Sequence, residues 1–199
     1  MILNRLDYNH SGGAYYGVGY NLLERGCFDP EDVLVLKKLL DLRRQIIGDG
    51  IIAIDAGANI GVHTIEWAKH MTGWGEVVSI EAQERIFYAL AGNIAINNCF
   101  NARAIYAALS NEISTLKIPV PNYTEPASFG SLELKHSVQN EFIGQNIDYT
   151  DAKTIEIETK TIDSLNLKRI DLIKIDVEGM ELEVLTGAHE SIKNYKPIM

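Results

Sequence analysis

The pattern of apolar and polar positions predicts a regular alternation of strands and helices over most of the chain. Runs rich in β-branched residues predict strands at 51–55, 76–81, 103–107 and 171–176. Helical spacing of apolar residues predicts helices at 61–71, 83–97 and 181–194. The first and last strands are almost entirely apolar, which is typical of parallel strands covered on both faces. We therefore expect an α/β fold with a doubly wound, mainly parallel sheet and right-handed crossovers.

Two helices have more detailed signals. The segment Asp29-Pro30-Glu31-Asp32 predicts a helix start, with Asp29 as the cap and acids in the first turn, and the helix should end near residues 48–50. Its expected apolar face comprises Val33, Leu36, Leu39 and Leu40. The expected apolar face of the helix at 181–194 comprises Leu182, Leu185, Ala188 and Ile192.

The remaining segments define the expected domain organisation. Residues 1–28 are interpreted as an N-terminal arm in preference to a mobile lid, and 29–199 as one domain. A β-rich, hairpin-like insertion is expected at about 112–162, before the fourth core strand, with strands at 114–120 and 154–162. The second of these alternates in polarity, so one of its faces should be wet. The chain ends at 196–199, just after a helix, so we expect further C-terminal strands to be missing.

Charge and composition exclude some classes of binding partner and cellular location. The 199 residues carry a net charge of −9 at a sequence pI near 5.0, without a basic stripe, which argues against nucleic acid as the main partner. The N-terminus lacks a signal-peptide pattern, and no apolar run approaches the roughly 20 residues of a membrane span. The isolated Cys27 and Cys99 suit a reduced thiol state. The expectation is a cytoplasmic protein that is not inserted in a membrane.

The turn after the first strand, Asp55-Ala-Gly-Ala-Asn-Ile-Gly61, stands where ligands bind on such sheets. Gly57 and Gly61 would let the backbone approach a ligand, and Asn59 would cap the next helix. A tight turn without any ligand is the alternative. The dinucleotide fingerprint G-x-G-x-x-G is absent, and Asp55 would repel a pyrophosphate, so a nicotinamide dehydrogenase is disfavoured.

The second strand ends on Glu81, followed by Ala82. A carboxylate at this strand tip can accept hydrogen bonds from both hydroxyls of a ribose. Taken alone, Glu81 could equally be a solvated acid. Together with Asp55 it describes a site for a ribose and a cationic tail, and S-adenosylmethionine has both.

These residues carry a resemblance to a known family. The segments IDAGANIGVHT (54–64), VSIEA (78–82), NIAINN (93–98) and IDLIKIDVEGMELEVLTGA (170–188) resemble those of the FkbM family of class I S-adenosylmethionine-dependent methyltransferases. The resemblance spans roughly 25–199 and implies a Rossmann-like methyltransferase fold and methyl transfer to a hydroxyl oxygen, often of a sugar or another small molecule. It implies that the turn holds the methionine portion of the cofactor and that the tip of the second strand holds the ribose. The expected cofactor residues are Asp55, Ala56, Gly57, Ala58, Asn59, Gly61, Glu81, Ala82 and Asp176.

Candidate catalytic residues follow the fourth strand. Asp176 and Glu178 stand at and just beyond its carboxyl end, and one of them would orient or deprotonate the acceptor. Alternatively, Glu178 caps the next helix and Asp176 pairs with Lys174. His63 is a second candidate base, and His136 is a weaker one.

Some expectations stay open. Ser128, Gly130 and Ser131 would contact the cofactor or acceptor, or form a plain turn; Asn93, Asn97 and Asn98 would approach the adenine or cap a helix. No metal is expected, because the acids lack a His/Cys cluster beside them. The sequence leaves open whether the chain is a homo-oligomer. A non-catalytic cofactor-binding or interaction domain is the alternative to an O-methyltransferase.

Overall fold

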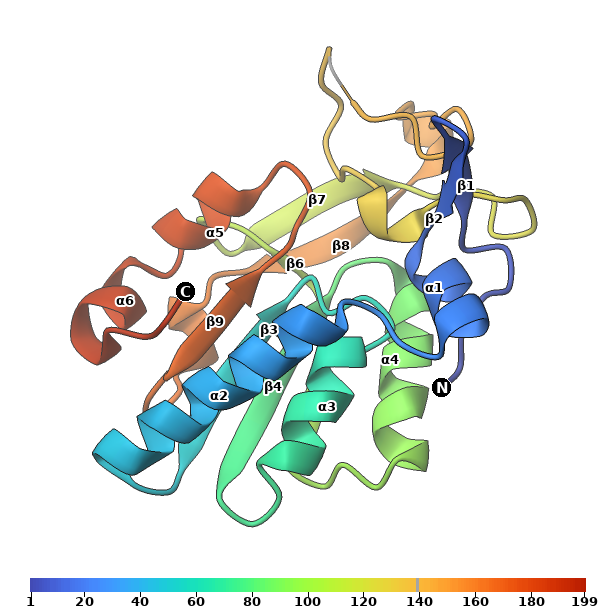
Figure 1. The fold of residues 1–199 in the computed structure, drawn as a ribbon. Helices are drawn as coiled ribbons and strands as arrows, with labels where there is room; N and C mark the ends of the chain where they lie inside the picture. The colour runs from blue at the N-terminus through green and yellow to red at the C-terminus, as the bar shows by residue number, and fades with distance from the viewer. Residues whose placement is uncertain (139) are drawn as a thin grey trace.

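A computed structural model describes residues 1–138 and 140–199 and has an α/β architecture (Figure 1). Its central sheet has four parallel strands in the order β5-β4-β3-β9. The strands are β3 (Ile51–Ala56), β4 (Gly75–Glu81), β5 (Ala102–Tyr106) and β9 (Leu172–Ile175). The expected α/β fold with a parallel sheet is confirmed, and each core strand lies within two residues of its predicted bounds.

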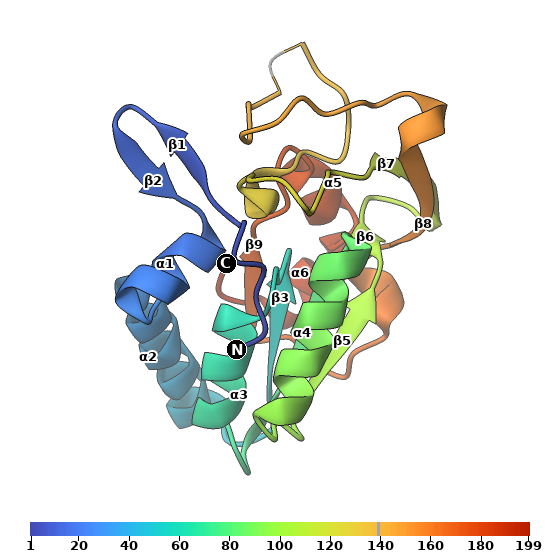
Figure 2. The same cartoon turned by 90° about the vertical axis from the view of Figure 1, so that its right-hand side faces the viewer.

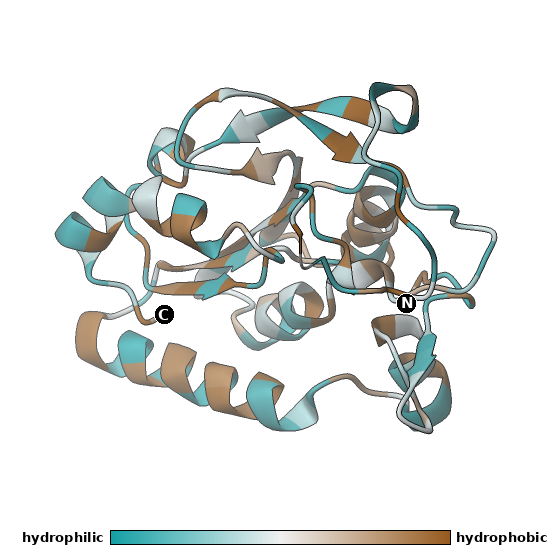
Figure 3. Ribbon diagram, turned by 90° about the horizontal axis from the view of Figure 1, so that it is seen from above, coloured by the Kyte–Doolittle hydropathy of each residue, from teal (hydrophilic) through white to brown (hydrophobic). Residues whose placement is uncertain are grey.

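Helices cover both faces of this sheet (Figures 1 and 2). Three of them, α2 (Pro30–Ile47), α3 (Val62–His70) and α4 (Glu84–Ile96), contribute side chains to a core on one face that includes Leu40 and Trp67. On the other face, α5 (Glu181–Thr186) contributes Val184 to a second core, and Ile192 of α6 (His189–Tyr195) packs against it. In Figure 3, hydrophobic and hydrophilic residues alternate along α2, as its amphipathic sequence requires.

The strand order creates a switch point in the sheet. The chain winds outward from β3 through β4 to β5 and then returns to place β9 on the opposite side of β3. The loops after β3 and β9 therefore leave the sheet side by side. In open α/β sheets, ligands bind in the crevice beyond the carboxyl ends of the strands at such a point.

A second sheet contains β6 (Ala108–Leu109), β7 (Ser114–Pro119) and β8 (Thr154–Lys160) in the order β6-β8-β7. Strands β7 and β8 are antiparallel, and β6 pairs with β8 in parallel. Along β8, Ile157 and Thr159 are buried whereas Glu156 and Glu158 are exposed, so one face of this strand is exposed to solvent, as predicted. Three 3-10 turns, η1 (Phe129–Ser131), η2 (Asp151–Lys153) and η3 (Asp163–Leu165), complete this region.

The first 28 residues form the hairpin β1 (Asn9–Ser11) and β2 (Ala14–Tyr16) and the helix α1 (Val18–Arg25). They lie near the upper ends of the core strands, beside η1, in both views (Figures 1 and 2). In the described part of the chain, no helix combines the length and apolar character that crossing a membrane requires.

Two helix predictions need correction. Asp29 does precede α2, but its backbone is left-handed and its side chain makes no capping hydrogen bond. The single helix expected at 181–194 is two helices, because a tertiary contact interrupts it: a Cβ at Gly187 would lie 2.1 Å from the carbonyl oxygen of Ser110. Asp163 then accepts hydrogen bonds from two amides in the first turn of α6. The expected apolar face is also wrong in part, since Leu182 is 74% exposed.

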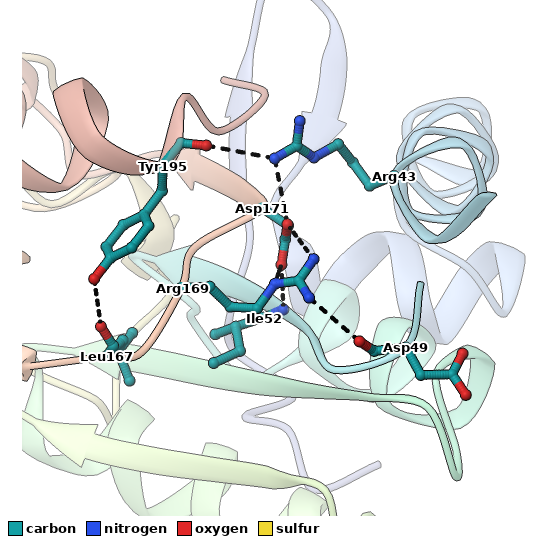
Figure 4. A network of polar contacts seen from close by, with 7 residues as sticks. All are labelled: Arg43, Asp49, Ile52, Leu167, Arg169, Asp171 and Tyr195. Carbon is teal, nitrogen blue, oxygen red and sulfur yellow. Dashed lines mark hydrogen bonds and ion pairs between the residues drawn. The ribbon is translucent and has the colours of Figure 1, made fainter. Parts of the chain in front are cut away.

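A buried ion pair joins the amino-terminal end of β9 to its neighbours (Figure 4). The Asp171 carboxylate accepts two hydrogen bonds from the guanidinium of Arg169, at 2.8 and 2.9 Å, and one from the backbone amide of Ile52 at 2.9 Å. Arg43 of α2 donates to the same carboxylate at 3.3 Å and to the carbonyl of Tyr195 at the end of α6. One carboxylate thus connects β3, β9 and α2, and Arg43 extends the network to α6.

We predict that Asp171→Asn lowers the free energy of unfolding by about 2–3 kcal/mol, because a charged acceptor of several hydrogen bonds is lost in a buried position. Chemical denaturation at constant pH measures the change. Asp151→Asn is the control: Asp151 pairs with Lys117 on the exposed surface, where such a pair contributes about 1 kcal/mol or less. Equal effects of the two variants would contradict the assignment.

Candidate functional site

A cavity of about 380 Å³ lies beyond the carboxyl ends of the core strands. Its volume is within the range of about 300–1,000 Å³ that small-molecule sites occupy. It is lined by the turn after β3, the end of β4, the residues after β5, the segment after β9, and two segments outside the core sheet. The last two are residues 16–29 of the N-terminal region and residues 128–134.

Six of the nine expected cofactor residues line this cavity: Gly57, Ala58, Asn59, Glu81, Ala82 and Asp176. Asp55, Ala56 and Gly61 do not. Asp55 and Ala56 are fully buried in β3, behind the cavity wall, and Gly61 precedes α3. The structure thus brings most of the expected set together, whereas Asp55 can act on a ligand here only through its charge and its neighbours.

Packing and backbone conformation explain why glycine stands at positions 57 and 61, in addition to the expected close approach of a ligand. Both adopt positive φ, 76° at Gly57 and 91° at Gly61. A Cβ at Gly57 would lie 1.8 Å from the carbonyl oxygen of Asp176, and one at Gly61 would lie 2.6 Å from the Leu90 side chain. The turn is therefore packed against β9 and α4. The expected capping role of Asn59 is wrong: α3 begins after Gly61, and the Asn59 side chain accepts from the amide of Ile60.

Asp55 forms the buried base of a polar cluster. Its Oδ2 accepts a hydrogen bond of 2.6 Å from the hydroxyl of Thr64, which also contacts the Ser79 hydroxyl at 2.7 Å. Its Oδ1 lies 3.7 Å from Nζ of Lys174, and that ammonium donates to Asp176 at 2.8 Å. The expected pairing of Lys174 with Asp176 is therefore present. Burial lowers the pKa of Lys174, but the two carboxylates more than offset this and raise it, so Lys174 stays protonated.

Glu81 is a carboxylate held at the cavity wall by backbone amides. It is 6% exposed, and its two oxygens accept hydrogen bonds from the amides of Asn59 at 2.9 Å and Gln83 at 2.8 Å. Burial nevertheless raises the pKa of Glu81 to about 7, against the lowering effect of these amides. No cation pairs with it in the described residues. The carboxylate is thus fixed in position and short of partners, as a ligand-binding acid is.

Glu178 stands at the other side of the cavity, after β9. Burial raises its pKa to about 7, and the charges of Asp176, Glu141, Glu181 and Glu133 add to the shift. Its backbone is strained, with φ at 30°. The alternative role as a helix cap is wrong, because α5 follows Met180 and has no side-chain cap. A carboxyl group that titrates near neutral pH in a cavity is suited to exchange protons.

Of the two candidate histidines, only His63 lines the cavity. It is 7% exposed, burial lowers its pKa, and its Nε2 has no hydrogen-bond partner in the described structure. It is therefore neutral at pH 7 and able to accept a proton. His136 lies outside the cavity lining, with its ring 5.2 Å from that of Tyr149.

Ser128, Gly130 and Ser131 line the cavity, so this segment is part of the site and also a turn. The expected approach of Asn93, Asn97 and Asn98 to a ligand is wrong, as none of them lines the cavity. Asn93 instead holds the chain start: it donates to the carbonyls of Ile2 and Ile60. Among the described residues, no group of three or more His, Cys, Asp or Glu side chains is arranged to hold a metal ion.

Several residues that line the cavity were not predicted to do so from the sequence: Tyr16, Val18, Asn21, Phe28, Asp29, Lys174 and Met180. The strand alternation that placed Lys174 beside Asp176 was a usable signal for that residue. The N-terminal residues had no comparable signal, because only their tertiary contacts bring them to the cavity.

Comparison with known proteins identifies the family. The model of the methyltransferase FkbM domain matches residues 55–199, which include the turn, Glu81 and the segment after β9. The chain belongs to the FkbM methyltransferase family. The resemblance that the sequence motifs carry is thereby confirmed.

The relatives are distant. Methyltransferase sdnD of Sordaria araneosa is 28% identical over 157 residues, covering 69% of this chain and 60% of the relative. Methyltransferase 1 of Beauveria bassiana is 28% identical over 149 residues, covering 70% and 59%. The chain thus spans about three fifths of the length of these two relatives. A crystal structure of methyltransferase FkbM from Methylobacillus flagellatus is similar at a TM-score of 0.49 and 19% identity, covering 75% of this chain and 32% of that one.

The raised pKa of Glu178 predicts a pH-dependent cost in stability. The folded state holds this proton up to about pH 7, whereas the unfolded state releases it near the ordinary glutamate pKa of 4.5, so wild-type stability falls as the pH rises between these values. Glu178→Gln removes this dependence. We expect its thermal midpoint, relative to wild type, to rise from pH 4.5 to 7 and then level off.

Thermal unfolding at several pH values measures this difference. Glu156→Gln, on the exposed face of β8, is the matched control and should show no such trend. A constant difference between Glu178→Gln and wild type across the pH range would contradict the raised pKa.

Proposed function

We propose that the cavity binds S-adenosylmethionine and that the protein transfers its methyl group to a hydroxyl oxygen of a small-molecule or carbohydrate acceptor. The observation that carries this proposal is the geometry of Glu81: a buried carboxylate at the tip of β4, held by the amides of Asn59 and Gln83, facing the cavity at the switch point of the sheet. Membership of the FkbM family supports the proposal.

The residues present fit this cofactor. A ribose brings two hydroxyl donors to Glu81, which has no cationic partner within residues 1–138 and 140–199. The α-ammonium and sulfonium bring positive charge towards the turn, where Asp55 and Asp176 outnumber the single Lys174. A dinucleotide fits less well, since its pyrophosphate would meet these carboxylates and the glycine fingerprint is absent.

The bound cofactor would supply an electrophilic methyl group on a sulfonium. The chain would contribute alignment and exclusion of water, and well-oriented intramolecular reactions gain up to about 7–11 kcal/mol in this way. Lys174 would hold Asp176 in place beside the turn, because the ammonium donates to this carboxylate and stays protonated. Asp176 would then act by its charge.

Glu178 is the preferred general base among the three candidates. Asp176 already accepts a hydrogen bond from the Lys174 ammonium, so one of its two oxygens is occupied. Glu178 has a pKa near neutral pH and lies on the cavity wall. His63 is the second candidate, since it is neutral and its Nε2 is free of protein partners in the described structure. A proton from the acceptor hydroxyl would pass to Glu178 as the oxygen attacks.

A non-catalytic cofactor-binding domain is the alternative function. It shares the prediction of cofactor binding and differs in turnover, so incubation with labelled S-adenosylmethionine and a panel of hydroxyl acceptors separates the two. Nothing in the geometry favours the alternative specifically.

We predict that S-adenosylhomocysteine binds the protein and that Glu81→Ala weakens this binding by at least about tenfold, because two charge-assisted hydrogen bonds to the ribose are lost. Isothermal titration calorimetry measures both dissociation constants. Glu76→Ala is the matched control, since Glu76 is an exposed glutamate at the opposite end of the same strand. NADH serves as the comparison ligand, and tighter binding of NADH than of S-adenosylhomocysteine would exclude the proposed cofactor.

For any accepted hydroxyl substrate, we expect kcat/KM to rise with pH and to level off above about pH 7, because the base must be deprotonated. Glu178→Gln should lower the plateau by about 10²–10⁴-fold and remove this titration. If His63→Gln removes it and Glu178→Gln does not, His63 is the base.

A further inference from the structure

The N-terminal region provides part of the cavity although it lies outside the family-matched residues, which begin at Asp55. Tyr16, Val18 and Asn21 line the cavity from β2 and α1. A second wall, formed by residues 128–134, also stands outside the core sheet. These two walls meet the glycine turn at one point: a Cβ at Gly130 would lie 2.7 Å from Nδ2 of Asn59 and 3.8 Å from the Val18 side chain. The position of either wall therefore affects the space for a ligand.

One buried side chain joins the two walls. The Asp7 carboxylate is 2% exposed and accepts a hydrogen bond from the amide of Gly19 at 2.9 Å and one from the amide of Phe129 at 3.0 Å. Gly19 belongs to the N-terminal wall, and Phe129 begins the turn that contains Gly130 and Ser131. The two oxygens of a single carboxylate thus hold two walls that are more than 100 residues apart in the sequence.

The backbone around Asp7 reinforces this junction. Its carbonyl accepts from the amide of Tyr20, and Ala127 donates to the carbonyl of Leu6 beside it. Asp7 also fits tightly against the N-terminal wall: a Cβ at Gly19 would lie 2.7 Å from its Cβ, and one at Gly17 would lie 2.6 Å from its carbonyl oxygen. No cationic side chain faces the carboxylate among its described contacts, and burial raises its pKa. An acid retained in such a position is there for its two acceptor oxygens.

We propose that residues 16–29 are a wall of the ligand site and that Asp7 is the positioning residue that fixes this wall against residues 128–134. Asp7 touches no ligand itself. It acts through Gly19 and Phe129, whose positions set those of Val18 and Gly130 against Asn59 of the glycine turn. This inference rests on the proposed function for the identity of the ligand, S-adenosylmethionine or its product.

The test compares two isosteric substitutions of buried aspartates. Asp7→Asn places an amide donor against one of two backbone donors at the cavity. Asp171→Asn disturbs the ion pair at the opposite end of the sheet, away from the cavity (Figure 4). Calorimetric titration with S-adenosylhomocysteine should show binding weakened by at least about tenfold in Asp7→Asn and within about threefold of wild type in Asp171→Asn. Both variants should melt below wild type, so loss of stability alone does not produce the difference.

Hydrogen exchange of the ligand-free protein provides a second readout. Asp7→Asn should speed amide exchange in both walls, at residues 16–25 and 127–134, while β3, β4 and β9 keep wild-type protection. Asp171→Asn should not speed exchange in these walls selectively. If wild type fails to bind S-adenosylhomocysteine, the proposed cofactor is wrong, and the exchange pattern alone decides whether Asp7 joins the walls.

Three results would overturn the inference: Asp7→Asn binding like wild type, equal weakening by both variants, or exchange that rises in only one wall. If Asp7→Asn does not fold, Gly19→Ala replaces it. The added methyl group would press on Asp7 and separate the N-terminal wall from it while leaving the carboxylate and Phe129 intact. The same weakening and the same exchange pattern are expected, and wild-type behaviour of Gly19→Ala would refute the role of Asp7.

Discussion

The parallel pairing of β3 with β9 is the constraint on which the site depends. It places the turn after β3 directly against the end of β9, so closely that Gly57 has no room for a Cβ beside the carbonyl of Asp176. The same pairing brings Lys174 between Asp55 and Asp176. The glycine turn and the paired charges are therefore consequences of one strand neighbouring another across the switch point of the sheet.

The pKa values of the groups around the cavity follow from the burial of several acidic side chains beside few cationic ones. Lys174 compensates two carboxylates, whereas Glu81 and Glu178 have no cationic partner among the described residues, and burial raises the pKa of each to about 7. Buried acids without a cationic partner reduce the stability of a ligand-free fold at neutral pH. Acids of this kind are typical of sites that bind a ligand or transfer a proton. Glu81 ends β4 and Glu178 follows β9, which separates a ribose-binding role from a proton-accepting role within one cavity.

The sequence predicted the parts of the fold that depend on local pattern. The first and last core strands are almost entirely apolar, and Glu81 and Asp176 could be placed because strand ends share one edge of a parallel sheet. The split of α5 from α6 could not be predicted, since it depends on contact of Gly187 with Ser110 of a distant segment. The N-terminal wall was likewise hidden, because Asp7 finds its partner Phe129 across 122 residues of chain. Contacts of that range leave no periodic signal.

The proposed binding of the cofactor at Glu81 and the glycine turn is tested most directly by a crystal structure of the chain with S-adenosylhomocysteine. In this crystal structure we expect both ribose hydroxyls to donate to the carboxylate of Glu81. The homocysteine portion should lie along Gly57–Asn59, and residues 16–21 and 128–131 should enclose the ligand. A nucleoside bound outside this cavity, or one inside it whose ribose does not contact Glu81, would contradict the account.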